Sequence, residues 1–108
     1  MGDVTLTETQ TGSSVEANPG DRIIVALEES PTSGFRWELD PLDQDVLELE
    51  SSDFIPADAS HLGGDGMREV SFRVKKAGSA HIALKLWRDW EGEASVTRRF
   101  AVDVIAGS

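Results

Sequence analysis

Few residues in this chain of 108 residues have the chemistry that catalysis or metal binding requires. The sequence has no cysteine, so it offers no thiolate nucleophile, no thiolate metal ligand and no disulfide. Its two imidazoles are separate, since His61 falls in a glycine-rich segment and His81 on the polar side of an alternating one. We interpret both as surface histidines rather than as metal ligands or general bases.

Two other patterns could hold a ligand, but each lacks part of the required signature. Asp40, Asp43 and Asp45 could ligate calcium, yet they lack the glycine and the distal glutamate of a helix-loop-helix calcium site. The cluster Gly63-Gly64-Asp65-Gly66 does not join a strand to a helix, so no helix N-terminus could hold a phosphate there. We therefore expect no catalytic residue, no metal ion and no cofactor, and we do not expect an enzyme.

Two loops carry residues that are typical of protein recognition. Arg88-Asp89-Trp90 contains the two residue types that are most enriched in binding hot spots. Trp90 either folds back onto the edge of a sheet or stays exposed for a partner, and composition leaves both possibilities open. In Ser30–Phe35, Pro31 fixes its own backbone and Gly34 permits a positive φ. This loop is either an ordinary turn or a preorganised binding loop.

These loops must be positioned by β-strands, because apolar and polar residues alternate along most of the chain and helical stripes are missing. A loop is expected from Ser51 to Gly66, where glycines and Pro56 replace the alternation. The spacing predicts an all-β fold, an immunoglobulin-like β-sandwich of about seven to eight strands in a single domain over residues 1–108. The expected strands are residues 4–6, 22–28, 35–39, 46–50, 70–74, 80–86 and 96–104.

The overall charge limits the kinds of partner. Twenty acidic and ten basic residues give a net charge of −10 at pH 7, and such a surface repels nucleic-acid phosphates and anionic lipids. We therefore expect no nucleic acid and no membrane as partner, and we expect a monomer. Because the N-terminus lacks an export signal, we expect a cytoplasmic protein or a trimmed periplasmic or secreted form.

Three segments follow one another in an informative order: Ser30-Pro31-Thr32-Ser33-Gly34-Phe35, Gly63-Gly64-Asp65-Gly66 and Arg88-Asp89-Trp90. They resemble the three loop motifs of the chagasin family, inhibitors of papain-like cysteine peptidases. Those motifs are Asn-Pro-Thr-Thr-Gly-Tyr/Phe, Gly-x-Gly-Gly and Arg-Pro-Trp/Phe. Trp37 and Gly78 also match the framework of the family, so the resemblance covers nearly the whole chain.

Four residues depart from the motifs of that family. Ser30 replaces Asn and Ser33 replaces Thr, and both keep a small hydrogen-bonding side chain. Asp65 stands where the second motif usually has Gly, which adds charge and restricts the backbone. Asp89 replaces Pro, which frees the backbone and adds a negative charge beside Trp90. We therefore expect affinity or target range to differ from the usual behaviour of the family.

The resemblance implies an immunoglobulin-like fold whose three loops gather at one end as a wedge that enters the peptidase cleft. By the pattern of the family, residues 31–34 would cover the catalytic cysteine and histidine of the enzyme. Leu62 would enter its apolar specificity pocket, and Trp90 with Arg88 would pack on the leaving-group side. The implied peptidase-binding residues are Ser30, Pro31, Thr32, Ser33, Gly34, Phe35, Leu62, Gly63, Gly64, Asp65, Gly66, Arg88, Asp89 and Trp90.

Two other interpretations remain open at this point, because a fold does not fix a function. One is an immunoglobulin-like protein-binding or adhesion module without inhibitory activity. The other is a small enzyme or metal protein. Below, the first loop is Ser30–Phe35, the second loop is Leu62–Gly66 and the third loop is Arg88–Trp90.

Overall fold

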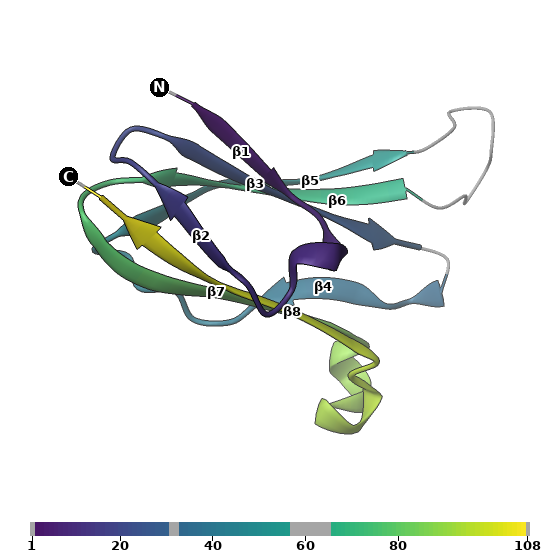
Figure 1. Cartoon of the computed structure of the whole chain (residues 1–108). Coiled ribbons are helices and arrows are strands. Elements are labelled where there is room, and N and C mark those ends of the chain that lie inside the picture. Colours follow the sequence, from purple (N-terminus) through teal and green to yellow (C-terminus); the bar gives the residue numbers. More distant parts are fainter. Residues whose placement is uncertain (1, 31–32, 57–65, 108) are drawn as a thin grey trace.

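The structure is a computed structural model that describes residues 2–30, 33–56 and 66–107. Within these residues, eight β-strands form two four-stranded sheets that face each other (Figure 1). The strands are β1 (Asp3–Leu6), β2 (Ser14–Ala17), β3 (Arg22–Glu29), β4 (Arg36–Leu39), β5 (Leu47–Pro56), β6 (Gly66–Val74), β7 (Gly78–Trp87) and β8 (Arg98–Ala106). Short 3-10 helices are η1 (Glu8–Gln10), η3 (Asp89–Glu91) and η4 (Glu93–Ser95). The all-β sandwich expected from the sequence is confirmed.

The strand order is β1-β3-β6-β5 in one sheet and β2-β8-β7-β4 in the other. Neighbouring strands are antiparallel except for the edge pairs β1 with β3 and β2 with β8, which are parallel. The chain therefore crosses from one sheet to the other between β3 and β4. That crossing is the first loop, so its two ends belong to different sheets.

The alternation in the sequence places the apolar side chains between the sheets. In β3, Ile23, Val25 and Leu27 are fully buried, while Arg22 and Glu28 are exposed. Each fully buried aliphatic or aromatic side chain contributes about 1.5–3 kcal/mol to folding, so this core is the main stabilising element. The largest fully buried side chains are Phe72, Phe100, Ile23, Leu27, Leu47, Ile82, Val25, Val74, Val102 and Val104. Among the described residues, no helix is long and apolar enough to span a membrane.

Several strand boundaries differ from the sequence-based expectation, and β2 was not among the expected strands. The loop expected from Ser51 begins later, because β5 continues to Pro56 as the partner of β6. A register shift between Leu49 and Ser51 interrupts the period of two, which hid the second half of this strand in the sequence. The last strand begins at Arg98 rather than at Val96.

The two ends of the sandwich are built differently (Figure 1). One end holds the first loop, the ends of the β5–β6 pair and the helices η3 and η4. We call it the loop pole. The opposite end holds the turn at residues 18–21 between β2 and β3, and the turn at residues 75–77 between β6 and β7. We call it the turn pole.

Candidate functional site

The described part of the first loop is a tight turn with its own hydrogen bonds. The Ser33 backbone N–H donates to the Ser30 carbonyl oxygen at 3.1 Å, and Ser33 Oγ donates to the same oxygen at 2.7 Å. The Phe35 N–H donates to Ser33 Oγ at 3.2 Å. Gly34 has a φ of 83°, in the region that favours glycine. Pro31 and Thr32 lie outside the described residues.

The third loop runs into the 3-10 helix η3, and η4 follows it before β8 begins. Ser95 organises these turns, because its Oγ accepts the Arg88 N–H at 3.0 Å and lies 2.7 Å from the Gly92 carbonyl oxygen. Glu93 ties η4 to the sheet through Lys85, with an Nζ to Oε1 distance of 2.9 Å. The hydrogen bond from Lys85, together with Arg99, holds the pKa of the Glu93 carboxyl below its usual range.

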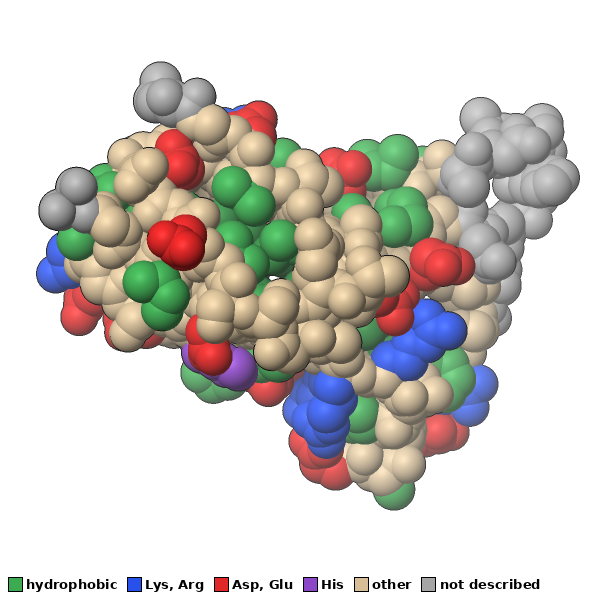
Figure 2. All heavy atoms as spheres, in the orientation of Figure 1, with side chains coloured by type: hydrophobic (Ala, Val, Ile, Leu, Met, Phe, Trp, Pro, Cys, Tyr) green, Lys and Arg blue, Asp and Glu red, His purple; other side chains and the backbone are tan. Residues whose placement is uncertain are grey.

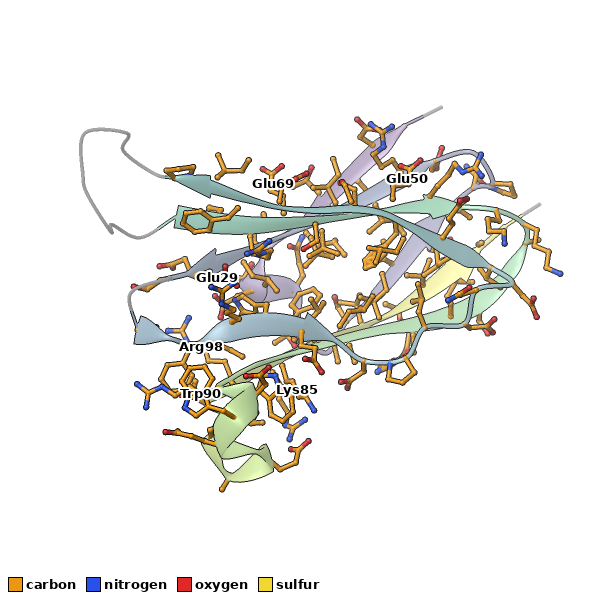
Figure 3. The ribbon with its side chains drawn as sticks, turned by 180° about the vertical axis from the view of Figure 1, so that it is seen from behind. Glu29, Glu50, Glu69, Lys85, Trp90 and Arg98 are labelled. Atoms are coloured by element: carbon orange, nitrogen blue, oxygen red, sulfur yellow. The ribbon has the colours of Figure 1, made fainter. Side chains whose placement is uncertain are left out.

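The two possibilities left open for Trp90 are now resolved. Its side chain is on the surface with 68% of its area exposed, so it does not fold back into the sheet (Figure 3). Trp87, which could have closed the core, is only half-buried and stacks under Lys85, whose Nζ lies 3.7 Å from the ring centroid. An indole with this exposure can bury a large area against a partner.

Arg88 joins the first and third loops. Its Nε and Nη2 donate to the Ser33 carbonyl oxygen at 3.3 and 3.0 Å, and its Cζ lies 4.4 Å from the centroid of the Phe35 ring. Trp90 packs against Gly34, since a Cβ at residue 34 would lie only 3.0 Å from the Trp90 Cη2. The two loops, separated by more than fifty residues, therefore form one continuous surface.

Around Trp90, this surface is hollowed. A depression of about 390 Å³ lies beside the indole, lined by Gly34, Trp87 and Asp89 among others. Basic and acidic side chains are interspersed on the face that carries η3 and η4 (Figure 2). They include the ion pairs of Arg98 with Glu8 and of Arg99 with Glu93, both 3.1 Å long. The loop pole thus combines an exposed aromatic side chain with a polar surround.

The second loop meets the described structure at Gly66. Leu62, Gly63, Gly64 and Asp65 lie outside the described residues. Gly66 was expected within a long loop, but it is the buried first residue of β6, paired with Pro56 and with Glu29 at the base of the first loop. A Cβ there would lie 2.6 Å from the Phe54 Cζ. Close packing, rather than loop flexibility, therefore explains this glycine.

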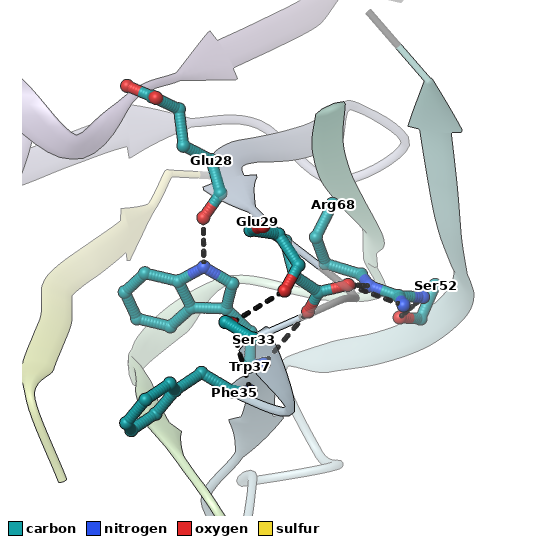
Figure 4. Close-up of polar contacts among 8 residues, drawn as sticks. Glu28, Glu29, Ser33, Phe35, Trp37, Ser52 and Arg68 are labelled. Atoms are coloured by element: carbon teal, nitrogen blue, oxygen red, sulfur yellow. Dashed lines mark hydrogen bonds and ion pairs between the residues drawn. The ribbon is translucent and has the colours of Figure 1, made fainter. Parts of the chain in front are cut away.

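Sequence reasoning missed a buried ion pair beneath these loops. Glu29 is 3% exposed, and its Oε1 lies 2.8 Å from the Arg68 Nη2 (Figure 4). The sequence did indicate that Glu29 is buried, because Glu29 continues the inward-facing series of Ile23, Val25 and Leu27 at every second residue. Arg68 likewise shares its parity with the buried residues of β6. A charge on the apolar side of a strand indicates a buried partner.

Among the described residues, no group of three or more acidic or histidine side chains could hold a metal ion. Asp40, Asp43 and Asp45 do not converge as ligands in this part of the chain. His81 lies on the outer face of its sheet, where its Nδ1 is 2.8 Å from Asp103 Oδ1, and His61 lies outside the described residues.

Comparison with known proteins shows similarity over nearly the whole chain. The pattern of the family described as "Chagasin family peptidase inhibitor I42" matches residues 16–104. Chagasin from Trypanosoma cruzi is 26% identical over 102 residues, which cover 90% of this chain and 92% of chagasin. The crystal structure of the cysteine protease inhibitor EhICP2 from Entamoeba histolytica superposes with a TM-score of 0.88 and 23% identity, covering 99% of this chain and 97% of that one.

A further solved structure, PbICP-C in complex with falcipain-2, has a TM-score of 0.64 and 16% identity, and covers 99% of this chain and 100% of that one. Fold and site thus define a β-sandwich that presents two side-chain-linked loops and an exposed tryptophan at one pole. The chain belongs to the chagasin family of peptidase inhibitors. The resemblance carried by the three loop motifs is confirmed.

Proposed function

We propose that this protein is a reversible inhibitor of papain-like cysteine peptidases, and that its loop pole enters the active-site cleft as a wedge. The observation that carries the proposal is the direct link from Arg88 to the Ser33 carbonyl oxygen. Through this link, the first and third loops form one surface before any partner binds. Rigid loops lose little conformational entropy on binding, so more of the contact energy becomes affinity. Membership of a family of peptidase inhibitors supports this class of partner.

Each loop has a separate role in this proposal. Residues 31–34 of the first loop cover the catalytic cysteine and histidine of the enzyme and exclude its substrate. Leu62 of the second loop enters the apolar specificity pocket of the enzyme. Trp90 anchors the third loop on the leaving-group side, where the depression beside its indole accepts side chains of the enzyme. PbICP-C was solved in complex with falcipain-2, which supports a cysteine protease as the partner.

The proposal also explains how a loop in the cleft escapes cleavage. Acyl transfer requires the carbonyl oxygen of the attacked bond to enter the oxyanion site of the enzyme. The Ser33 carbonyl oxygen already accepts two hydrogen bonds from the Arg88 guanidinium, inside the inhibitor. The peptide bond between Ser33 and Gly34 is therefore held out of the reactive geometry.

A titration tests the proposal directly. Papain and cathepsin L would be assayed with a fluorogenic peptide at increasing concentrations of the protein, with a trypsin-like serine peptidase as the control enzyme. We expect saturable, reversible loss of activity of the cysteine peptidases and none for the serine peptidase. Unchanged rates for all three enzymes would contradict the proposal and favour a binding module without inhibitory activity. Equal inhibition of all three would contradict the assigned enzyme class.

A further inference from the structure

The buried ion pair beneath the first loop is a built feature of the loop pole (Figure 4). Arg68 donates from Nη2 and Nε to the Glu29 Oε1, at 2.8 and 3.2 Å. The side chains of Glu29 and Arg68 are 2% and 17% exposed. Ion pairs of this kind contribute little to stability, because the loss of hydration offsets the attraction between the charges. The role of the pair is therefore better inferred from the strands that it connects than from the stability that it adds.

The second carboxylate oxygen of Glu29 reaches the opposite sheet. The Trp37 backbone N–H donates to Glu29 Oε2 at 2.9 Å, and the Trp37 indole Nε1 donates to the Glu28 carbonyl oxygen at 2.8 Å (Figure 4). Glu28 and Glu29 end β3, whereas Trp37 is the second residue of β4. These two bonds tie together the strands from which the first loop emerges.

Arg68 extends this tie to the strand pair that carries the second loop. It lies on β6, two residues after Gly66, which is the partner of Glu29 across the sheet. Its Nη1 also lies 3.4 Å from Ser52 Oγ on β5. One guanidinium group thus connects the base of the first loop with both strands of the β5–β6 pair.

We propose that Glu29 and Arg68 are positioning residues, which hold the base of the first loop and the β5–β6 strand pair in one fixed relation. This inference rests on the proposed function, because it explains how the first and second loops could enter one cleft together. Arg88 links the first loop to the third, and Arg68 links the base of the first loop to the β5–β6 pair. Neither residue of the buried pair needs to touch the peptidase.

The sharpest variant removes the link without leaving an unpaired charge. In the double variant Glu29→Gln/Arg68→Met, the glutamine oxygen still accepts the Trp37 N–H, and the methionine fills the space of the arginine stem. The strands of the first loop stay tied, and β3 remains paired with β6 through the backbone, but the side-chain link from Glu29 through Arg68 to Ser52 on β5 is lost. The matched control is Glu48→Gln/Arg73→Met, which makes the same two replacements in an exposed ion pair between β5 and β6, near the turn pole.

Two measurements would be made on the folded proteins: the inhibition constant against papain, and NMR order parameters of the backbone amides of Ser33, Gly34 and Gly66. We expect the buried variant to keep a melting temperature near that of the unchanged protein and to inhibit about tenfold more weakly, with lower order parameters at these amides. The exposed control should match the unchanged protein in both measurements. A purely stabilising role would instead lower the melting temperature and leave both readouts unchanged.

The outcomes separate this inference from the proposed function. If the unchanged protein does not inhibit papain, the proposed function fails, and the order parameters still test positioning in the free protein. If the buried variant is folded and both readouts equal those of the unchanged protein, the inference is wrong. If that variant does not fold, Arg68→Lys takes its place, because lysine keeps the charge but not the two-pronged contact with Glu29. An unchanged inhibition constant and unchanged order parameters in this variant would likewise overturn the inference.

Discussion

The two poles of the sandwich are held together by different kinds of bond. At the turn pole, backbone groups bond to each other: the Gly20 N–H donates to the Val74 carbonyl oxygen at 2.8 Å, and the Val74 N–H donates to the Asp21 carbonyl oxygen at 2.9 Å. At the loop pole, side chains far apart in the sequence make the connections, as Arg88 does with Ser33. The turn pole therefore supports the fold. The geometry of the loop pole depends instead on a few side-chain contacts, which single substitutions can remove.

This contrast predicts which substitutions change binding and which change stability. Substitutions at the loop pole should weaken inhibition while the protein stays folded. Substitutions at the turn pole should lower the free energy of unfolding and leave inhibition intact. The predictions below test this separation, from the largest expected effect on inhibition to the smallest.

Arg88→Ala should have the largest effect, because it removes two charged hydrogen bonds to the Ser33 carbonyl oxygen and the stacking on Phe35. We expect a loss of about 3 kcal/mol in binding to papain, or roughly 100-fold in the inhibition constant. The released loop should also be cut within residues 30–35 during long incubation, which intact-mass analysis would detect. Arg99→Ala, at a more exposed arginine, is the control. An uncut Arg88→Ala protein with full affinity would refute the role of Arg88.

Trp90→Ala should remove the aromatic anchor of the third loop. We expect binding to weaken by about 2 kcal/mol, near 30-fold, mainly through faster dissociation measured by surface plasmon resonance. The midpoint of urea unfolding should hardly change, because the indole is 68% exposed in the free protein. A normal dissociation rate would show that Trp90 lies outside the interface.

A comparison of Gly34→Ala with Gly12→Ala should separate the effect of backbone strain from the effect of contact with Trp90. At residue 34, the φ of 83° strains any side chain, and an added Cβ would also contact the Trp90 ring. At residue 12, the φ of 87° causes similar strain, but an added Cβ would contact nothing. Both variants should lose about 1–2 kcal/mol of folding stability in urea unfolding. Gly34→Ala alone should also weaken inhibition, by about tenfold, because it displaces Trp90. Equal inhibition by the two variants would mean that the packing of Trp90 on Gly34 is unimportant for binding.

Asp21→Asn at the turn pole should change stability and leave inhibition unchanged. Hydrogen bonds from the backbone N–H groups of Asn18 and Gly2 hold the pKa of the Asp21 carboxyl below its usual value. A lowered pKa in the folded protein contributes stability above the unfolded value of about 3.9, and this contribution is lost as the pH falls through the folded pKa. Urea unfolding should therefore show a destabilised variant at neutral pH and a shrinking difference below about pH 4. A weaker inhibition constant at neutral pH would break the separation of the poles.

The sequence predicted the parts of the molecule that depend on local pattern. Alternation in β6 and β7 placed their buried side chains correctly, because a period of two directly assigns residues to a face. The second half of β5 was missed because the register shift after Leu49 breaks that period. The Asn-Pro-Gly-Asp sequence at residues 18–21 is typical of a tight turn, and the Asp21 N–H donates to the Asn18 carbonyl oxygen at 2.9 Å there.

The candidate site was predictable as a set of loops but not as an assembly. The motifs identified the first and third loops, yet nothing in their spacing indicated that Arg88 bonds to Ser33, 55 positions away in the sequence. The exposure of Trp90 likewise depends on the η3 turn, which local composition did not predict. Glu29 and Arg68 could have been found from their inward parity, but their mutual contact depends on the pairing of β3 with β6.

The most direct test of the account is NMR mapping of the surface that papain covers. With isotope-labelled inhibitor and a papain variant whose catalytic cysteine is replaced by serine, we predict large changes in the amides of Ser33 and Gly34 and in the Trp90 indole N–H. The Trp37 indole N–H, bonded to the Glu28 carbonyl oxygen, and the amides of residues 18–21 should stay nearly unchanged. Changes confined to the turn pole or to the outer face of either sheet would contradict the account.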